Sequence, residues 1–146
     1  MRFLDDDGQF GLLVSPLPGH RMFRFQLVID GRLVGDREGC ILGSVMTQLK
    51  NRRHIDDERL DLLHENPTEF MELFAVDEFL HDSTIMSSVE SLDQWTVHSY
   101  VRAGRFVVAA QEVVAQKVNP ILIADISEAE FDTIVDAARS YWLKSQ

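Results

Sequence analysis

The five histidines of this 146-residue chain are the first candidates for metal chemistry, since imidazole nitrogens are common zinc ligands. They are scattered along the sequence, at His20, His54, His64, His81 and His98. Asn66-Pro67 follows His64-Glu65, so the His-Glu-x-x-His spacing of zinc proteases is missing. Cys40 is the only cysteine, which excludes an internal disulfide and a cysteine-rich zinc site. We therefore expect structural or exposed histidines and no metal site.

Two residues have nucleophilic side chains but lack the usual companions of a catalytic nucleophile. Cys40 stands beside an apolar helix start, where the pKa of a thiol can be lowered, yet no histidine is close in sequence. A lone cysteine in such a place usually packs as a small apolar side chain. Ser44 follows Gly43, but the Gly-x-Ser-x-Gly elbow of hydrolases is absent. The sequence predicts no catalytic residues.

Phosphate-binding loops are also missing. Gly35, Gly39 and Gly43 recur every four residues, without the Gly-Lys-Ser/Thr of a P-loop or the spacing of a dinucleotide site. Turn or packing roles suit these glycines better, and we expect no cofactor. Carboxylates are plentiful, so a pair acting as general acid and base stays an open alternative. In a run of like charges, however, acids usually face solvent.

The acidic residues are concentrated in one stretch of the chain. The formal net charge is −10, from 14 Lys and Arg against 24 Asp and Glu. Residues 54–93 hold twelve of the acids and a single base, Arg59, so this stretch carries −11 and the remainder +1. Such a surface attracts basic partners and repels nucleic acid. The alternative is a solvated helical face that only aids solubility.

Length and composition favour one ordinary domain covering 1–146. The apolar fraction is 45%, and no Pro-, Gly- or Ser-rich linker divides the chain. An apolar run of about 18 residues, as a membrane span needs, is missing, and residues 1–7 lack the apolar centre of a signal peptide. We therefore expect a cytoplasmic protein that binds neither membrane nor nucleic acid, while its oligomeric state stays open.

The stretch from Met22 to Leu49 organises the predicted fold. An apolar run at 22–29 precedes Asp30-Gly31, the dipeptide favoured in two-residue hairpin turns, and 32–34 supply the return strand. From Gly39 onward, apolar residues recur at helical spacing, namely Ile41, Leu42, Val45, Met46 and Leu49. The pattern predicts a hairpin followed by an amphipathic helix. Before it, we expect a frayed segment at 1–9 and a first strand at 10–14.

The acid-rich stretch has a helical pattern. Asp56 is a candidate N-cap for a helix that ends near Asn66, and Asn66-Pro67 with Glu69 then begins a second helix. The apolar stripe of this second helix consists of Phe70, Leu73, Phe74 and Leu80. Residues 81–91 are expected to form a polar connection.

The C-terminal third predicts a hairpin, a strand and a helix. Residues 95–102 and 105–112 alternate around a turn at Ala103-Gly104, and 121–126 form a last apolar strand. Ser127 and Glu130 make a capping box, after which one helix face is apolar (Phe131, Ile134, Val135, Ala138 and Trp142). Together the elements predict an α+β fold, an antiparallel sheet built from hairpins with helices packed on it.

The order of these elements resembles that of bacterial polymorphic-toxin immunity proteins. Residues 27–36 (LVIDGRLVGD), followed by a helix with spaced Leu42 and Leu49, resemble an N-terminal signature of the immunity protein 42 family. The opening of the second hairpin at 93–97 (DQWTV) and the strand-to-helix junction at 127–132 (SEAEFD) are similar too. The resemblance extends loosely over most of the chain.

That resemblance implies a small cytosolic protein without catalytic activity, which binds and neutralises a cognate toxin domain, as in contact-dependent growth inhibition. The family supplies no site residues. We expect the toxin to face the acid-rich stretch, because steered association suits a basic partner such as a nuclease. The candidate interface residues are Asp56, Asp57, Asp61, Glu65, Glu69, Glu72, Asp77 and Glu78.

Two alternatives from other classes stay open at this point. One is a hydrolase that uses clustered carboxylates, and the other is a generic protein-interaction adaptor. A cleft with desolvated acids would favour the enzyme. A convex acidic face with exposed aromatic side chains would favour the binder.

Overall fold

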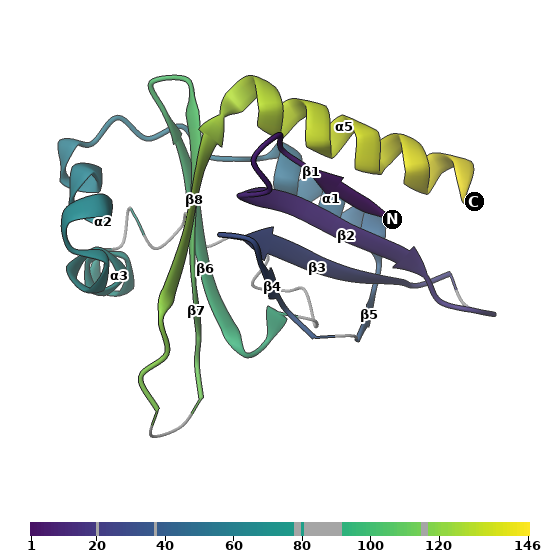
Figure 1. The fold of residues 1–146 in the computed structure, drawn as a ribbon, viewed down its shortest axis with the longest axis horizontal. Coiled ribbons are helices and arrows are strands. Elements are labelled where there is room, and N and C mark those ends of the chain that lie inside the picture. Colours follow the sequence, from purple (N-terminus) through teal and green to yellow (C-terminus); the bar gives the residue numbers. More distant parts are fainter. Residues whose placement is uncertain (20, 37, 78–79, 81–91, 115–116) are drawn as a thin grey trace.

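The computed structural model describes residues 1–19, 21–36, 38–77, 80, 92–114 and 117–146. Figure 1 shows its strands and helices in two sheets with helical layers on either side. The elements, in chain order, are β1 (Arg2–Leu4), β2 (Phe10–Pro16), β3 (Phe23–Ile29), β4 (Arg32–Val34), β5 (Gly39–Cys40), α1 (Leu42–Lys50), η1 (Glu58–Asp61), α2 (Leu62–Glu65), α3 (Pro67–Val76), β6 (Trp95–Arg102), β7 (Arg105–Glu112), β8 (Ile121–Ser127) and α5 (Glu128–Lys144).

The first sheet has the strand order β1-β2-β3-β4, and β5 pairs with the other end of β3. β1 was not predicted, since residues 1–9 were expected to be frayed. It pairs antiparallel with β2, with Phe3 opposite Leu12, and the amino group of Met1 donates to Val14 O at 2.9 Å. A three-residue edge strand owes its conformation to its neighbour, so its own sequence pattern does not reveal it.

The turn predicted at Asp30-Gly31 is confirmed. The φ angle is 51° at Asp30 and 69° at Gly31, positive at both central positions as a type I′ turn requires. β3 and β4 pair antiparallel across it, with Ile29 opposite Arg32.

Helix α1 begins three residues later than predicted. Gly39 and Cys40 form the short strand β5, with Cys40 opposite Phe23, instead of the first turn of the helix. Backbone pairing with β3 therefore overrides the helical spacing of the side chains at this point. The helix buries four of the five residues of the predicted face (Leu42, Val45, Met46 and Leu49). The fifth, Ile41, was wrongly predicted to belong to that face, because it precedes the helix and is exposed.

The second sheet has the order β6-β7-β8 and confirms the predicted second hairpin and last strand. Ala103 and Gly104 form the turn with φ angles of 50° and 72°, and Arg102 lies opposite Arg105. The two predicted hairpins thus belong to two separate sheets.

The acid-rich stretch forms η1, α2 and α3 within the described residues. Its first N-cap is Asp57, whose carboxylate accepts from the backbone N–H of Arg59, so the prediction of Asp56 as the cap was wrong by one residue. Asn66 caps α3 as predicted, accepting from Glu69 N, with Pro67 at the first helical position. The predicted polar connection at 81–91 lies outside the described residues.

Helix α5 confirms the predicted capping box and apolar face. Ser127 Oγ accepts from Glu130 N at 3.1 Å, and Glu130 Oε2 accepts from Ser127 N at 3.3 Å. Trp142 is partly buried against the core, and four side chains of the face are fully buried, namely Phe131, Ile134, Val135 and Ala138.

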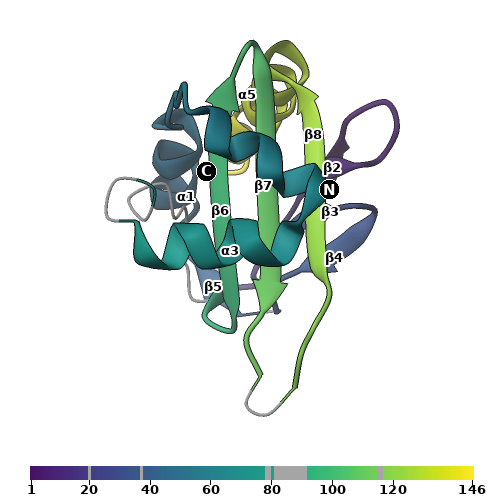
Figure 2. The same cartoon turned by 90° about the vertical axis from the view of Figure 1, so that its left-hand side faces the viewer.

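Two apolar clusters hold these layers together. The larger lies between the two sheets, α1 and α5, and contains the rings of Phe10, Phe106 and Phe131. The smaller lies on the opposite face of β6–β8, where α2 and α3 cross the strands (Figure 2). The α+β prediction is confirmed. Among the described helices, none is long and apolar enough to cross a membrane.

Candidate functional site

Within the acid-rich stretch, the described segment of residues 54–77, with Leu80, forms an outer layer of the molecule. Its apolar side chains pack against Tyr100, Val107 and Ala109 of the second sheet, and they are Ile55, Leu60, Leu63, Phe70, Met71, Phe74 and Leu80. The helices that carry the acids therefore use one face for the core and present the other to solvent (Figure 2). The predicted interface residues that the structure describes lie along this solvent side in three different electrostatic settings.

The first setting is a pair of ion pairs around Arg59. Its Nη2 donates to Asp57 Oδ2 at 2.6 Å, and its Nη1 donates to Asp77 Oδ2 at 2.9 Å. The hydrogen bonds from Arg59 hold the pKa of Asp57 below its ordinary value. This arginine ties η1 to the end of α3, so two of the predicted interface acids are already partly neutralised.

The second setting is Arg102, at the end of β6. Arg102 Nη1 donates to Asp61, and its Nε lies 3.7 Å from Asp56 Oδ1. Both carboxylates keep most of their exposure, 73% for Asp61 and full exposure for Asp56. These acids can meet a partner while remaining anchored to the second sheet.

The third setting consists of acids whose charge is not offset. Glu65 on α2 and Glu69 and Glu72 on α3 are exposed, and none forms an ion pair with the residues that the structure describes. We call these three residues the acidic face. Glu78, the last predicted interface residue, lies outside the described residues.

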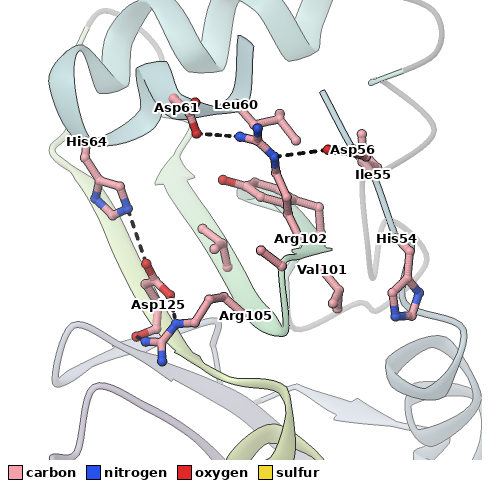
Figure 3. Close-up of a pocket in the computed structure, with 13 residues that line it drawn as sticks. His54, Ile55, Asp56, Leu60, Asp61, His64, Val101, Arg102, Arg105 and Asp125 are labelled. Carbon is pink, nitrogen blue, oxygen red and sulfur yellow. Dashed lines mark hydrogen bonds and ion pairs between the residues drawn. The ribbon is translucent and has the colours of Figure 1, made fainter. Parts of the chain in front are cut away.

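A pocket opens between η1, α2 and the β6–β7 hairpin, and Figure 3 shows its residues. Its volume is about 740 Å³. The apolar part of its lining includes Ile55, Leu60, Val101 and Val107, and the polar part is His54, Asp56, Asp61, His64, Tyr100, Arg102, Arg105 and Asp125. The pocket thus joins two predicted interface acids to residues of all three strands of the second sheet.

Asp125 organises the side of the pocket opposite Asp61 (Figure 3). Arg105 Nε donates to Asp125 Oδ1 at 2.9 Å, and Arg105 Nη2 donates to the backbone oxygen of Asp125 at 3.0 Å. His64 Nε2 lies 3.4 Å from Asp125 Oδ2. A histidine beside a carboxylate can serve acid–base chemistry, yet His64 is 59% exposed and Asp125 is shared with an arginine.

Tyr100 is the most deeply buried polar residue of the pocket, at 5% exposure. Its ring lies 6.1 Å from that of Phe70 and 6.4 Å from that of Phe74. Burial, followed by the charge of Asp125, raises the pKa of Tyr100 well above its ordinary value. Its hydroxyl therefore keeps its proton throughout the physiological range.

A further cluster joins the loop after α1 to the start of α5. Arg52 Nη2 lies 2.7 Å from Glu128 Oε1 and 2.9 Å from Asp132 Oδ1, and its guanidinium sits 5.3 Å from the ring centre of Phe131. His54 Nε2 also lies 3.2 Å from Glu128 Oε1. The hydrogen bond from Arg52 lowers the pKa of Glu128. The cluster anchors helix α5 at its N-terminus, where acids are favoured.

Neither the pocket nor the Arg52 cluster was predicted from the sequence. Arg102 and Asp61 are 41 positions apart, and Arg52 and Glu128 are 76 apart, so no local spacing signals either pair. The described residues hold no group of three or more His, Cys, Asp and Glu side chains placed to bind a metal ion. Cys40 is buried, in keeping with a packing role.

Comparison with known proteins finds one relevant likeness. No protein-family model matches the chain, and no curated protein matches it. A solved structure of CdiI from Burkholderia dolosa AUO158 aligns with a TM-score of 0.64 at 15% identity, covering 97% of this chain and 99% of that one. The likeness agrees with the resemblance to immunity proteins of contact-dependent growth inhibition, though nothing supports the immunity protein 42 family in particular. The chain shares its fold with this CdiI protein over nearly its whole length.

Proposed function

We propose that this protein is an immunity protein, which binds a cognate toxin domain in the cytoplasm and neutralises it without catalysis. The observation that carries the proposal is the likeness to CdiI from Burkholderia dolosa, because it extends over 97% of the chain rather than a common substructure. The resemblance noted in residues 27–36 and 127–132 points to the same class.

We further propose that the toxin approaches the acidic face, Glu65, Glu69 and Glu72. Exposed acids without internal partners create the strongest field at long range and steer a basic partner. Predicted interface acids that are held by Arg59 or Arg102 contribute less to steering. They remain candidates for direct contact, since their exposed oxygens can accept further hydrogen bonds (Asp56, Asp57, Asp61 and Asp77).

The alternative function, a hydrolase, would use the pocket, which is lined by carboxylates and by two histidines, His54 and His64. A general acid active near neutral pH needs a raised carboxyl pKa. Two described carboxyl groups have a clearly shifted pKa, Asp57 and Glu128. In both, hydrogen bonds from an arginine lower the pKa. The pocket acids Asp56 and Asp61 are also well exposed rather than desolvated. These features favour binding over catalysis.

The proposal is tested by co-expressing this protein with the toxin domain encoded by the neighbouring gene and measuring growth. The acidic-face variant carries Glu65→Lys, Glu69→Lys and Glu72→Lys. We expect the wild-type protein to restore growth and this variant to lose most of that protection. Association measured with purified proteins should also slow several-fold with added salt, because the Debye length falls from ~10 Å at 0.1 M to ~3 Å at 1 M.

A matched control separates the acidic face from total charge. The control variant carries Asp6→Lys, Asp7→Lys and Asp136→Lys, three exposed acids remote in sequence from α2 and α3. Both variants make the same change in net charge, and we expect the control to protect cells like the wild type. If both variants protect cells equally, the acidic face does not take part in toxin binding and serves only solubility. If the wild-type protein gives no protection, the immunity function is refuted.

A further inference from the structure

The pocket beside η1 combines an acidic rim with an apolar floor. Asp56 and Asp61 stand on one side with Arg102 between them, and Asp125 stands on the other side with Arg105 beside it (Figure 3). The floor includes Ile55 and Leu60 from the acid-rich stretch, together with Val101 and Val107 from the second sheet. The volume of about 740 Å³ is in the range of sites that enclose a ligand or a short peptide segment.

The charge balance of the pocket selects a cation. Three carboxylates line it against two guanidinium groups, and each guanidinium is already engaged, Arg102 with Asp61 and Arg105 with Asp125. Glu58 and Glu65, both exposed, lie on the same short helical segments and add negative charge nearby. An incoming anion would have to displace an internal carboxylate, whereas a cation meets carboxylate oxygens with remaining acceptor capacity.

A second observation, independent of the acids, comes from Tyr100. It lines the pocket at 5% exposure, and its hydroxyl makes no hydrogen bond within the described part of the chain. Ser99 Oγ is the one fully buried side-chain oxygen without a partner among the described residues, so the Tyr100 hydroxyl is open to the pocket. A ligand that donates to this oxygen gains a hydrogen bond. The phenolic oxygen of Tyr100 can accept a hydrogen bond from a cationic donor.

We propose that this pocket receives an arginine from a basic segment of the bound toxin domain, an inference that rests on the proposed function. Guanidinium is planar, weakly hydrated and a forked donor, so it can bond carboxylate and hydroxyl oxygens together. Its three-carbon stem can cover the apolar floor. Lysine is a poorer occupant, because its compact ammonium is more strongly hydrated and enters a partly buried site at higher cost.

The test titrates the isotopically labelled full chain with the capped peptide Gly-Arg-Gly-Arg-Gly and follows backbone amide shifts by NMR. A citrulline peptide, equal in shape but uncharged, is the ligand control. We expect saturable shifts concentrated at Leu60, Tyr100 and Arg102, and binding of the citrulline peptide at least about tenfold weaker, as for a lost charged hydrogen bond.

Three protein variants locate the binding. Tyr100→Phe removes only the hydroxyl and should weaken the arginine peptide about threefold to tenfold, and Asp61→Asn should do the same. Asp136→Asn removes one exposed charge on α5 outside the pocket and the acidic face, and it should change affinity less than about twofold. If Tyr100→Phe does not fold, the comparison of Asp61→Asn with Asp136→Asn decides the question.

Several results would overturn the proposal. They are shifts spread evenly over the acidic surface, a loss of affinity with Asp136→Asn equal to that with Asp61→Asn, or inorganic phosphate binding the pocket more tightly than the arginine peptide. Because no toxin is present, these failures count against the pocket alone. A protein that binds the peptide as expected but gives cells no protection would instead refute the immunity function.

Discussion

Phe131 at the start of helix α5 is the residue on which the packing of the layers depends most. Its side chain is fully buried, stacked on Phe106 at 3.8 Å between ring centres and 5.7 Å from the ring of Phe10. The guanidinium of Arg52 lies over the ring, 5.3 Å from its centre. One side chain thus joins α5 to β2 of the first sheet and β7 of the second.

Replacing Phe131 by alanine should cost about 4 kcal/mol. Buried Phe→Ala changes cost roughly 3–5 kcal/mol from lost transfer free energy and the cavity left behind. Two aromatic contacts, each worth about 0.5–1.5 kcal/mol, keep this site above the lower end of that range. At about 2–4 °C per kcal/mol for a chain of this size, Tm should fall by about 8–16 °C.

The assay is urea unfolding followed by far-UV circular dichroism, with Leu143→Ala on the same helix as the control. Leu143 is 56% exposed, so its loss should change the free energy of unfolding by less than about 0.5 kcal/mol. A loss below about 1.5 kcal/mol for Phe131→Ala, or one equal to that of the control, would refute this description of the core.

Three smaller perturbations test other parts of the fold. Ser127→Ala removes the α5 cap and should lower the free energy of unfolding by about 1 kcal/mol in the same urea assay. The hydroxyl of Ser99 is buried without a partner among the described residues. Ser99→Ala should therefore raise the free energy of unfolding by about 0.5–1 kcal/mol, which thermal unfolding would show as a higher Tm. Arg52 lowers the pKa of Glu128 from its ordinary 4.5, so this pair stabilises the fold above pH 4.5 and is lost as pH falls through the lowered value. Glu128→Gln should therefore be less stable at pH 7 and lose less Tm than the wild type between pH 5 and pH 2.

Local chemistry explains the parts of the fold that were predictable. Asp30-Gly31 and Ala103-Gly104 mark turns because few residue pairs tolerate two successive positive φ angles. Ser127 and Glu130 mark a helix start because each side chain satisfies a backbone donor of the other. Features of this kind are decided within four residues, so the sequence displays them.

Long-range packing decided what the sequence could not reveal. Gly39-Cys40 is a strand only because β3 passes beside it, and β1 depends on β2 in the same way. The pocket exists because Arg102 lies next to Asp61 in the folded chain, 41 positions away. Charge counting located the acidic stretch, but only the structure separates acids held by arginines from the acidic face.

The central claim, neutralisation by binding, is tested most directly by titrating the activity of the purified toxin domain with this protein. Inhibition by binding predicts that activity falls in proportion to the protein added and vanishes at one equivalent, independent of incubation time. The affinity should be nanomolar or tighter, about −12 kcal/mol. Full inhibition by a small fraction of an equivalent, deepening with time, would reveal catalysis and contradict the account, as would toxin activity that stays unchanged at excess protein.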